Sequence, residues 1–590
     1  MAVLSDAPFY LPLNNSLTLQ NGAGTFTFGR TSSAGIVDSA TGLYIVLTPG
    51  NPRYDSVKRL YRNPAAVTNT LLYSRSMLSG ANAGKWLPSV SGFELVTNGT
   101  FDTNATGWTT YNCSLSVTGG QCTFTASGDN PYMSRSFSTA IGKQYKVSCN
   151  LISDSMTGTN LIKVGTVPGS GNIVGLGLSV GVENSFCFTA TGTTAYVSVS
   201  GGAGVSGQNI VVDNISVKAS DVTMTTDQTG IDATANSCTK LTANVGNATI
   251  SQTITAAASA GCAGVYVKRS VGAGNVWFTR DNYTTLLDIT DLINSSTFTL
   301  VALENTSVLN PVVGFKFETS GDAVIVDGMM NHLGTEIDFP IFTTTAAVTV
   351  NAETLTYQTA GNFSDTAGTI IATVERTNWA NNNGVVVGKA GSGLSTSASN
   401  SGVQALDGTN TVNGPVGSTM TRRKIGMKWS GSTMKTFAGG NFGASGSYDG
   451  SFNLTTIAIM PQSNGYIRDV AIWPTELSDE DMLSAASEQS DFSASVSFAS
   501  AAYANVIHSV SASMPINIDV TGDTSVIHSV SASMAIEFNA AMRANVIHSV
   551  SADLSIAFDA DFTSTWIIPS LKIDGSYDPP VIQGTYGPTT

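Results

Sequence analysis

The chain alternates apolar and polar residues over short stretches, and Gly, Asn and Pro residues separate one stretch from the next. Segments 142–152 (GKQYKVSCNLI), 184–193 (NSFCFTATGT) and 194–201 (TAYVSVSG) place every second side chain on one face, as half-buried antiparallel strands do. The stretch SDEDML at 478–483 differs, because Ser478 can cap a helix and acidic residues fill the first turn. The pattern predicts an all-β protein of several antiparallel β-sandwich domains with one short helix.

A short motif recurs near the end of the chain. VIHSVSASM occupies 506–514 and 526–534, and VIHSVSADL occupies 546–554, so the copies are 20 residues apart. Each copy predicts a two-strand unit that places Val, His, Val, Ala and Met or Leu on one face and Ser on the other. Because one such unit cannot bury this face by itself, we expect a short β repeat region that stacks on its neighbours or on sister subunits.

Threefold closure of the repeats around an axis would bury every copy of the apolar face and remove exposed sheet edges, so we expect a homotrimer. Rings of histidines in that trimer are a candidate transition-metal site. A repeat duplicates any residue whether or not it is a ligand, so we instead expect each histidine to pack with Val and Met. The expected subunit interface includes His508, His528, His548, Met514 and Met534.

Length and charge narrow the class of protein. At 590 residues the chain is long enough for about three or four domains of roughly 150 residues. Its 27 basic and 41 acidic residues give a net charge of −14, so no basic surface offsets a phosphate backbone and nucleic acid is not an expected partner. The sequence has no apolar run of about 18 residues, and its start does not resemble a classical export signal. We expect no membrane insertion.

The six cysteines all lie in the first half of the chain. They form no CxxC pair and have no histidines nearby, so a zinc site is not expected. An even number of cysteines permits disulfides. In a protein that assembles in a bacterial cytoplasm, however, we expect reduced and buried thiols.

Several separated pieces share one known pattern. FGRTS at 28–32, PRYD at 52–55 and TLLYS at 70–74 occur in the order in which similar pieces open many bacteriophage structural proteins, and GVYVKR at 264–269 and the segment 323–345 resemble later parts of the same pattern. The later pieces begin farther along the chain than they do in that pattern. This delay predicts a module inserted between Trp86 and about Val222. The resemblance implies a virion protein that is assembled in the host cytoplasm, and it implies no chemistry.

The inserted segment opens with FELVTNGTFD at 93–102 and closes with IVVDNISVK at 210–218. These ends resemble the first and last strands of carbohydrate-binding modules of the galactose-binding-like jelly-roll family. Because aromatic rings pack on the C–H face of a pyranose, the candidate glycan-binding residues are Tyr111, Tyr132 and Trp108, although Trp108 stands in the opening motif, where a core position is more common. The resemblance also implies a structural Ca²⁺, with Asp102 and Asp213 as candidate ligands.

GYIRDVAIW at 465–473, followed by Leu477 and Ser478, resembles the final strand of concanavalin/laminin-G-like sandwiches. EIDF at 336–339 resembles the catalytic strand of concanavalin-like glycoside hydrolases, in which paired carboxylates act on a sugar. Ile341 occupies the position of the third acid in that pattern. We therefore expect Glu336 and Asp338 to be non-catalytic and the chain not to be an enzyme.

These resemblances divide the chain into segments. The expected segments are 1–92, the start of a phage-type sandwich; 93–218, the jelly-roll insert; 219–345, the continuation of the first sandwich; 346–486, the concanavalin/laminin-G-like sandwich; 487–563, the repeats; and 564–590, an extended arm.

Two functions fit the sequence. The first is a fibre, spike or decoration protein of a phage particle that binds host cell-surface polysaccharide, with itself and other tail or capsid proteins as partners. The alternative is a bacterial carbohydrate-active surface or secreted protein, either a glycoside hydrolase or a lectin. The absence of an export signal and of a catalytic acid pair favours the phage protein.

Overall fold

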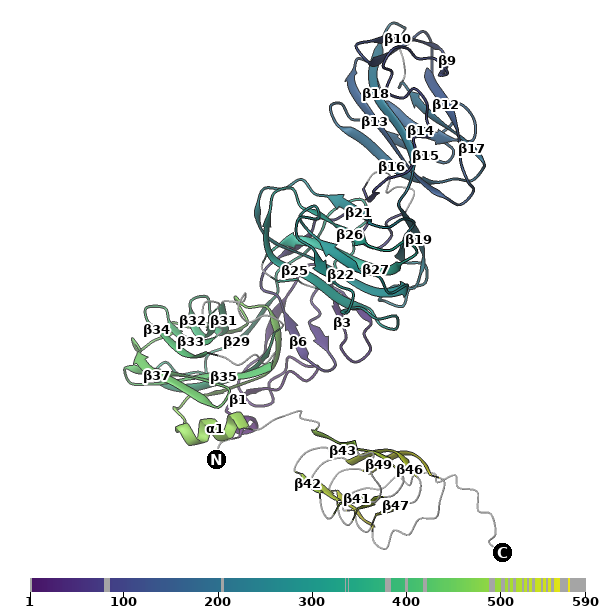
Figure 1. Cartoon of the computed structure of the whole chain (residues 1–590). Helices are drawn as coiled ribbons and strands as arrows, with labels where there is room; N and C mark the ends of the chain where they lie inside the picture. Colours follow the sequence, from purple (N-terminus) through teal and green to yellow (C-terminus); the bar gives the residue numbers. More distant parts are fainter. Residues whose placement is uncertain are drawn as a thin grey trace, which may run out of the picture. The chain divides into compact units, whose positions relative to one another are not determined.

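The computed structural model describes residues 3–78, 85–202, 206–334, 336–337, 339–376, 384–397, 402–416 and 422–487, and the backbone of strands between 494 and 573 (Figure 1). The chain forms two compact units, Met1–Ala486 and Ser487–Thr590. Nearly all of the regular secondary structure in the described part is β-strand, which confirms the predicted fold class. The one described α-helix, α1 (Asp479–Ser487), begins where predicted, and the Ser478 hydroxyl accepts a hydrogen bond from the Asp481 N–H at 3.0 Å.

Three sandwiches are nested in the sequence of the first unit. We call the innermost the insert sandwich. One of its sheets has the order β10 (Cys113–Thr118), β11 (Gln121–Ala126), β18 (Asn209–Ala219), β13 (Gln144–Asp154) and β16 (Glu183–Thr189). The other has the order β15 (Val174–Gly177), β14 (Leu161–Gly165), β17 (Thr194–Ser200), β12 (Tyr132–Ser138) and β9 (Thr109–Tyr111). The inward faces of both sheets form one apolar core that includes Phe124, Val147 and Val197.

The next sandwich, here the middle sandwich, is interrupted by the insert. Its first sheet has the order β19 (Val222–Gln228), β20 (Cys238–Ala243), β27 (Ala323–Leu333), β22 (Ser259–Val271) and β25 (Thr299–Val308). Its second has the order β24 (Leu287–Asp288), β23 (Val276–Thr279), β26 (Val312–Phe317), β21 (Ala248–Thr253) and β8 (Leu87–Pro88). When the strands of each sandwich are counted along the chain, the two sandwiches have the same strand order in both sheets. The insert lies between the first and second strands of the middle sandwich.

The third, or enclosing, sandwich combines the two ends of the first unit. Its eight-stranded sheet contains β37 (Asn441–Ser447), β36 (Thr433–Ala438), β35 (Arg422–Ser430), β30 (Ala367–Glu375), β39 (Gly465–Trp473), β6 (Arg59–Arg62) and β5 (Arg53–Asp55), with β1 (Phe9–Leu11) on β39. Its seven-stranded sheet contains β2 (Thr27–Gly29), β29 (Thr354–Gln358), β38 (Thr456–Ile459), β31 (Gly384–Lys389), β32 (Ser392–Ser397), β33 (Gly402–Asp407) and β34 (Thr411–Val416).

The start of the chain therefore does not belong where the sequence resemblance placed it. Segment 1–92 was expected to join 219–345. Its strand β8 does so, but its strands β1, β2, β5 and β6 belong to the enclosing sandwich. The reason is a shared buried core and a buried ion cluster. Phe9 is fully buried in the core of the enclosing sandwich. Arg30 and Arg53 bind the buried carboxylate of Glu353 at 2.8 and 2.9 Å.

Two short sheets connect these bodies. The hairpin β3 (Ala34–Val37) and β4 (Tyr44–Leu47) packs through Tyr44 against Ile231 and Tyr266 of the middle sandwich. Strand β7 (Val67–Asn69) pairs with β28 (Val348–Val350).

The repeats form a parallel β-solenoid rather than two-strand units. In the described backbone each repeat contributes one strand to each of three parallel sheets, and equivalent residues pair 20 apart, as Asn505 does with Ser525. The sheets are β40 (Ala494–Ala499), β43 (Ile516–Gly522), β46 (Ile536–Met542) and β49 (Ile556–Phe562); β41 (Asn505–Ile507), β44 (Ser525–Ile527) and β47 (Asn545–Ile547); and β42 (Val510–Ala512), β45 (Val530–Ala532), β48 (Val550–Ala552) and β50 (Leu571–Ile573).

The predicted two-strand unit is therefore wrong. The strand that begins each motif ends at Ile507, Ile527 or Ile547, and the next described strand belongs to a different sheet. Backbone hydrogen bonds join each repeat to the next within one chain, so stacking does not by itself require a second subunit. The homotrimer remains a prediction.

The six cysteines are free thiols. Burial raises the pKa of Cys149 and of Cys187 to about 12, which keeps both protonated at neutral pH. Within the described residues, no helix has the length and apolar character needed to cross a membrane.

Candidate functional site

The outer face of the insert sheet β15-β14-β17-β12-β9 carries two of the predicted glycan-binding residues. Met133 and Phe137 of β12 are buried in the core, so strand alternation places Tyr132, Ser134 and Ser136 on the outer face. Strand β9 pairs with β12 so that Tyr111 lies directly opposite Tyr132.

The two tyrosine rings stack on each other. Their centroids are 5.3 Å apart and their planes differ by 17°. The Tyr111 residue is nevertheless 52% exposed. Because one face of the Tyr111 ring contacts Tyr132, the exposure of the ring comes from its opposite face and its edges. This leaves a flat aromatic surface, held by its neighbour, open to solvent.

A glycine in the loop between β14 and β15 supports this arrangement. Gly169 has a φ of 72°, and its N–H donates to the Ser198 hydroxyl at 3.0 Å on the outer face. A Cβ atom on Gly169 would lie 2.4 Å from a carbon of the Tyr132 ring, so only glycine permits this approach. Gly169 was not predicted as a site residue from the sequence; the turn-forming PGSGN at 168–172 was the signal for a tight loop at this point.

Hydroxyl groups lie on the same sheet face as the tyrosine pair. The Thr109 and Ser134 hydroxyls are 2.9 Å apart on neighbouring strands; Thr109 and Ser136 are exposed, whereas Ser134 is fully buried. Lys163 of β14 lies opposite Ser198 of β17 on the same face. An exposed aromatic ring with hydroxyl and amine groups beside it can stack on a sugar ring and hydrogen-bond its hydroxyls.

Trp108 is not part of this surface. It is 7% exposed, its ring packs against Phe101 with centroids 5.5 Å apart, and its indole N–H donates to the Asn98 carbonyl at 2.9 Å. The structure removes Trp108 from the candidate glycan-binding residues, because the opening segment of the insert folds this side chain into the core.

The side chains expected at a calcium site do not gather into one. Asp102 accepts a hydrogen bond from the Thr100 hydroxyl at 3.1 Å, whereas Asp213 accepts one from the N–H of Asn214 at 2.7 Å. Among the described residues no three His, Cys, Asp or Glu side chains form a cluster. Calcium uses about six to eight oxygen ligands, and these two carboxylates do not fit that requirement by themselves. Calcium binding remains a prediction.

The carboxylate pair considered for hydrolysis is described only in part, because Asp338 lies outside the described residues. Glu336 interacts electrostatically with Arg376, whose pKa is lowered to about 10 by burial while Glu336 opposes that shift. Ile341, at the position of the third acid, is buried in a small apolar cluster. The expected interface residues His508, His528, His548, Met514 and Met534 also lie outside the described residues.

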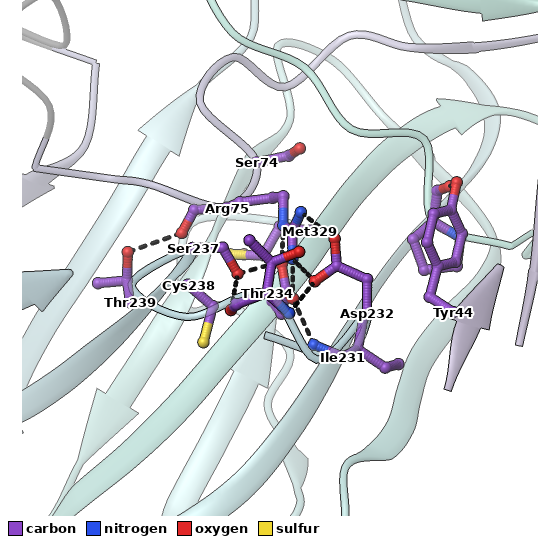
Figure 2. Close-up of polar contacts among 12 residues, drawn as sticks. Tyr44, Ser74, Arg75, Ile231, Asp232, Thr234, Ser237, Cys238, Thr239 and Met329 are labelled. Carbon is purple, nitrogen blue, oxygen red and sulfur yellow. Dashed lines mark hydrogen bonds and ion pairs between the residues drawn. The ribbon is translucent and has the colours of Figure 1, made fainter. Parts of the chain in front are cut away.

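A second polar cluster, in the middle sandwich, was not anticipated from the sequence. Arg75 directly follows the TLLYS motif, and its guanidinium donates to Asp327 at 2.8 Å. The guanidinium also donates to Asp232 at 2.6 and 2.8 Å (Figure 2). Its Nη2 also donates to the Ser237 hydroxyl, and the Thr239 hydroxyl donates to the Arg75 carbonyl (Figure 2).

The charges in this cluster are satisfied by one another. Burial alone would raise the pKa of Asp232, but hydrogen bonds from Arg75 outweigh burial and hold that pKa at about 2. Burial raises the pKa of Asp327, whose side chain is fully buried, although Arg75 opposes this shift. Because Nε, Nη1 and Nη2 of Arg75 all bond within the protein, we interpret the cluster as a clasp that holds the segment after β7 and not as a ligand site.

No family model matches the chain, and no curated protein matches it significantly. Among solved structures, a CBM4 protein is 16% identical over 21% of this chain and 99% of that chain, with a TM-score of 0.17. The CBM40 of a Ruminococcus gnavus sialidase is 13% identical over 22% and 91%, with a TM-score of 0.19. The tandem CBM22 domains of Paenibacillus barcinonensis Xyn10C are 10% identical over 42% and 99%, with a TM-score of 0.18. The function is therefore inferred from the residues of the chain, and not from these similarities.

Proposed function

We propose that this chain is a glycan-binding structural protein of a bacteriophage particle, of the fibre, spike or decoration kind. Its insert sandwich binds host cell-surface polysaccharide through the outer face that carries Tyr111. The observation that carries the proposal is the Tyr111–Tyr132 stack, in which Tyr111 remains 52% exposed on a sheet face lined with hydroxyl groups.

The aromatic surface of Tyr111 is already in place before a ligand arrives. Tyr132 is restrained by Gly169 on the loop, and Tyr111 is restrained by Tyr132, so little side-chain freedom is lost when a sugar ring stacks on Tyr111. An aromatic contact of this kind contributes about 0.5–1.5 kcal/mol beyond the area that it buries. One contact gives weak binding, and many copies on one particle would raise the overall avidity.

The virion part of the proposal is supported by the phage-like motifs. Arg30 and Arg53 of these motifs bind the buried Glu353, and the TLLYS segment is hydrogen-bonded into the middle sandwich, where the Leu72 N–H donates to Gln252 at 2.8 Å. The motif residues thus have structural roles, as expected if the shared pattern encodes a fold. Its direct test is the location of the chain in purified particles by imaging and peptide mass spectrometry. Finding the chain on a bacterial surface and not in particles would contradict this part.

Binding is tested with the full chain on a glycan array, followed by calorimetry on each glycan that gives a signal. We expect Tyr111→Ala to weaken binding roughly two- to twelve-fold, which corresponds to about 0.5–1.5 kcal/mol. Phe93→Ala is the matched control, because Phe93 is a 94% exposed aromatic residue of the same segment that lies outside the sheet face. An equal loss in both variants, or no loss in Tyr111→Ala, would show that the face does not bind the glycan.

We also propose that the chain has no glycosidase activity. Incubation of the purified protein with a bound polysaccharide should release no reducing ends. Release that is lost in Glu336→Ala would contradict the proposal and assign catalysis to that carboxylate.

A further inference from the structure

The middle sandwich presents a sheet equivalent to the one that carries the tyrosine pair. Because the two sandwiches share one strand order, sheet β24-β23-β26-β21-β8 corresponds strand by strand to β15-β14-β17-β12-β9. The inward residues Val276, Phe278, Phe315 and Phe317 are fully buried. Strand alternation therefore places Trp277 of β23 and Lys316 of β26 on the outer face.

Polar and aromatic residues form one continuous row across this outer face. Trp277 pairs with Asp288 on one neighbouring strand and with Lys316 on the other. Lys316 in turn pairs with Thr249, whose N–H donates to the Ser89 hydroxyl at 3.0 Å. The order across the sheet is thus a carboxylate, an indole, an amine and two hydroxyl groups.

The row carries a positive charge at Lys316 and a negative charge at Asp288, on opposite sides of Trp277. The Lys316 ammonium lies 5.3 Å from the centroid of the Trp277 ring, and it forms no ion pair with any carboxylate of the described residues. Asp288 stands two strands away, which is roughly 10 Å at the usual strand spacing. It is also engaged by the Thr290 hydroxyl and N–H. Lys316 is therefore a positive charge, beside an aromatic ring, that still lacks an anionic partner.

A loop again folds over the face, in the position equivalent to the loop that carries Gly169. The segment between β23 and β24 places Tyr283 close to the hydroxyls of Thr249 and Ser251. Burial raises the pKa of the Tyr283 hydroxyl, and the neighbouring hydroxyls of Ser251 and Thr249 oppose this shift. Gly314, between Ser251 and Thr279, adds no side chain to the face.

We propose that this face of the middle sandwich is a second saccharide site and that it prefers acidic saccharides, whose pyranose rings carry carboxylate groups. Trp277 stacks on the C–H face of the sugar, Lys316 binds the carboxylate by a charge-assisted hydrogen bond, and the Thr249 hydroxyl bonds a ring hydroxyl. Asp288, on the far side of Trp277, accepts hydrogen bonds from sugar hydroxyls and disfavours the reversed orientation. The inference extends the proposed function to a second face and does not depend on Tyr111.

The test uses the full chain and two probes in calorimetry, oligogalacturonate as the acidic probe and cello-oligosaccharide as the neutral one. We expect the acidic probe to bind more tightly than the neutral probe. Its affinity should fall as salt is added, because salt screens the charge of Lys316. Lys316→Met should weaken acidic-probe binding at least tenfold, and Trp277→Ala should weaken it similarly. Lys143→Met, which removes an exposed lysine of the insert, is the matched control and should leave binding unchanged.

The outcomes separate this inference from the proposed function. Retained acidic-probe binding in both Lys316→Met and Trp277→Ala, or no binding by the unmodified chain, would overturn the second site. Loss of all acidic-probe binding in Tyr111→Ala alone would also overturn it, while leaving the first site in place. Acidic-probe binding that depends on Lys316, in a protein whose Tyr111→Ala variant binds every array glycan normally, would support the second site and reject the first. Because Lys316 lies on the surface, its variant keeps the test valid if Trp277→Ala does not fold.

Discussion

The insert and middle sandwiches have the same strand order but are closed by the chain in different ways. The insert is continuous, and its two ends meet, since the Leu95 N–H donates to the Val217 carbonyl at 2.9 Å. The middle sandwich takes its first strand, β8, from before the insertion and its other nine strands from after it. One topology can therefore be built from contiguous or from distant segments, provided that the distant segment is held strongly enough.

Both apolar packing and hydrogen bonds hold the segment that precedes the insert in the middle sandwich. Trp86 is 2% exposed in the core of the middle sandwich, and its indole N–H donates to the Leu72 carbonyl at 3.0 Å. The Gln252 side chain accepts a hydrogen bond from the Leu72 N–H and donates one to the Leu72 carbonyl. Arg75 closes the clasp with Asp327. Closing a long loop costs entropy, and these buried contacts offset that cost. The ends of the insert are instead joined directly, by the backbone hydrogen bond between Leu95 and Val217.

The largest expected effect concerns folding of isolated fragments. Residues 93–219 alone should fold, because all strands and core residues of the insert are present. Residues 222–333 alone should not fold, because the core then lacks Leu71, Tyr73, Met77 and Trp86. Loss of one buried Trp costs about 3–5 kcal/mol, against a typical domain stability of about 5–15 kcal/mol. Circular dichroism with urea titration shows whether each fragment folds and unfolds cooperatively.

Deletion of 92–219 from the full chain is the control for this comparison. Ser91 and Asp221 are joined by a hydrogen bond of 3.0 Å, so a short Gly-Ser linker can close the gap. The shortened chain should keep the middle sandwich folded. Cooperative unfolding of 222–333 by itself would show that the preceding segment is dispensable and that the comparison is wrong.

A smaller effect should come from breaking the clasp. Arg75→Met leaves Asp327 buried without its charged partner, and removing one member of a buried ion pair costs about 3–5 kcal/mol. The matched variant in the insert is Lys146→Met, because Lys146 pairs at 3.8 Å with Glu183, whose side chain is 57% exposed. A surface pair of this kind contributes about 0–1 kcal/mol. Urea unfolding measures the free energy of unfolding of both variants. If both lose the same amount, the clasp does not explain the stability of the middle sandwich.

The smallest predicted effect compares two glycines of the insert. Gly169→Ala should destabilise the fold by about 1–2 kcal/mol from its positive φ, and should further disturb Tyr132 through the close Cβ contact. Gly181→Ala isolates the backbone contribution, because Gly181 has a φ of 78° with open space around it. Only Gly169→Ala should also weaken glycan binding. Identical stability and binding in the two variants would mean that the loop does not hold the tyrosine pair.

Local features of the fold were predictable from sequence because their causes are local. Period-two alternation such as that of 142–152 predicts a strand wherever it lies in the chain, and β13 confirms it. The cap at Ser478 likewise acts within one turn of α1. The placement of strands β1, β2, β5 and β6 was mispredicted, because the buried partners of Phe9 and Arg30 are more than 300 residues away along the chain.

The candidate site shows the same division. The sequence by itself determined an all-β chain, the turn-rich segments and the presence of aromatic residues in the insert, since composition and periodicity act over a few neighbouring residues. Tertiary structure alone decided that Trp108 is buried, that Tyr111 lies on Tyr132, and that Gly169 supports them. It also decided that each repeat supplies three strands to a solenoid, because pairing between strands depends on partners that a one-dimensional pattern does not specify.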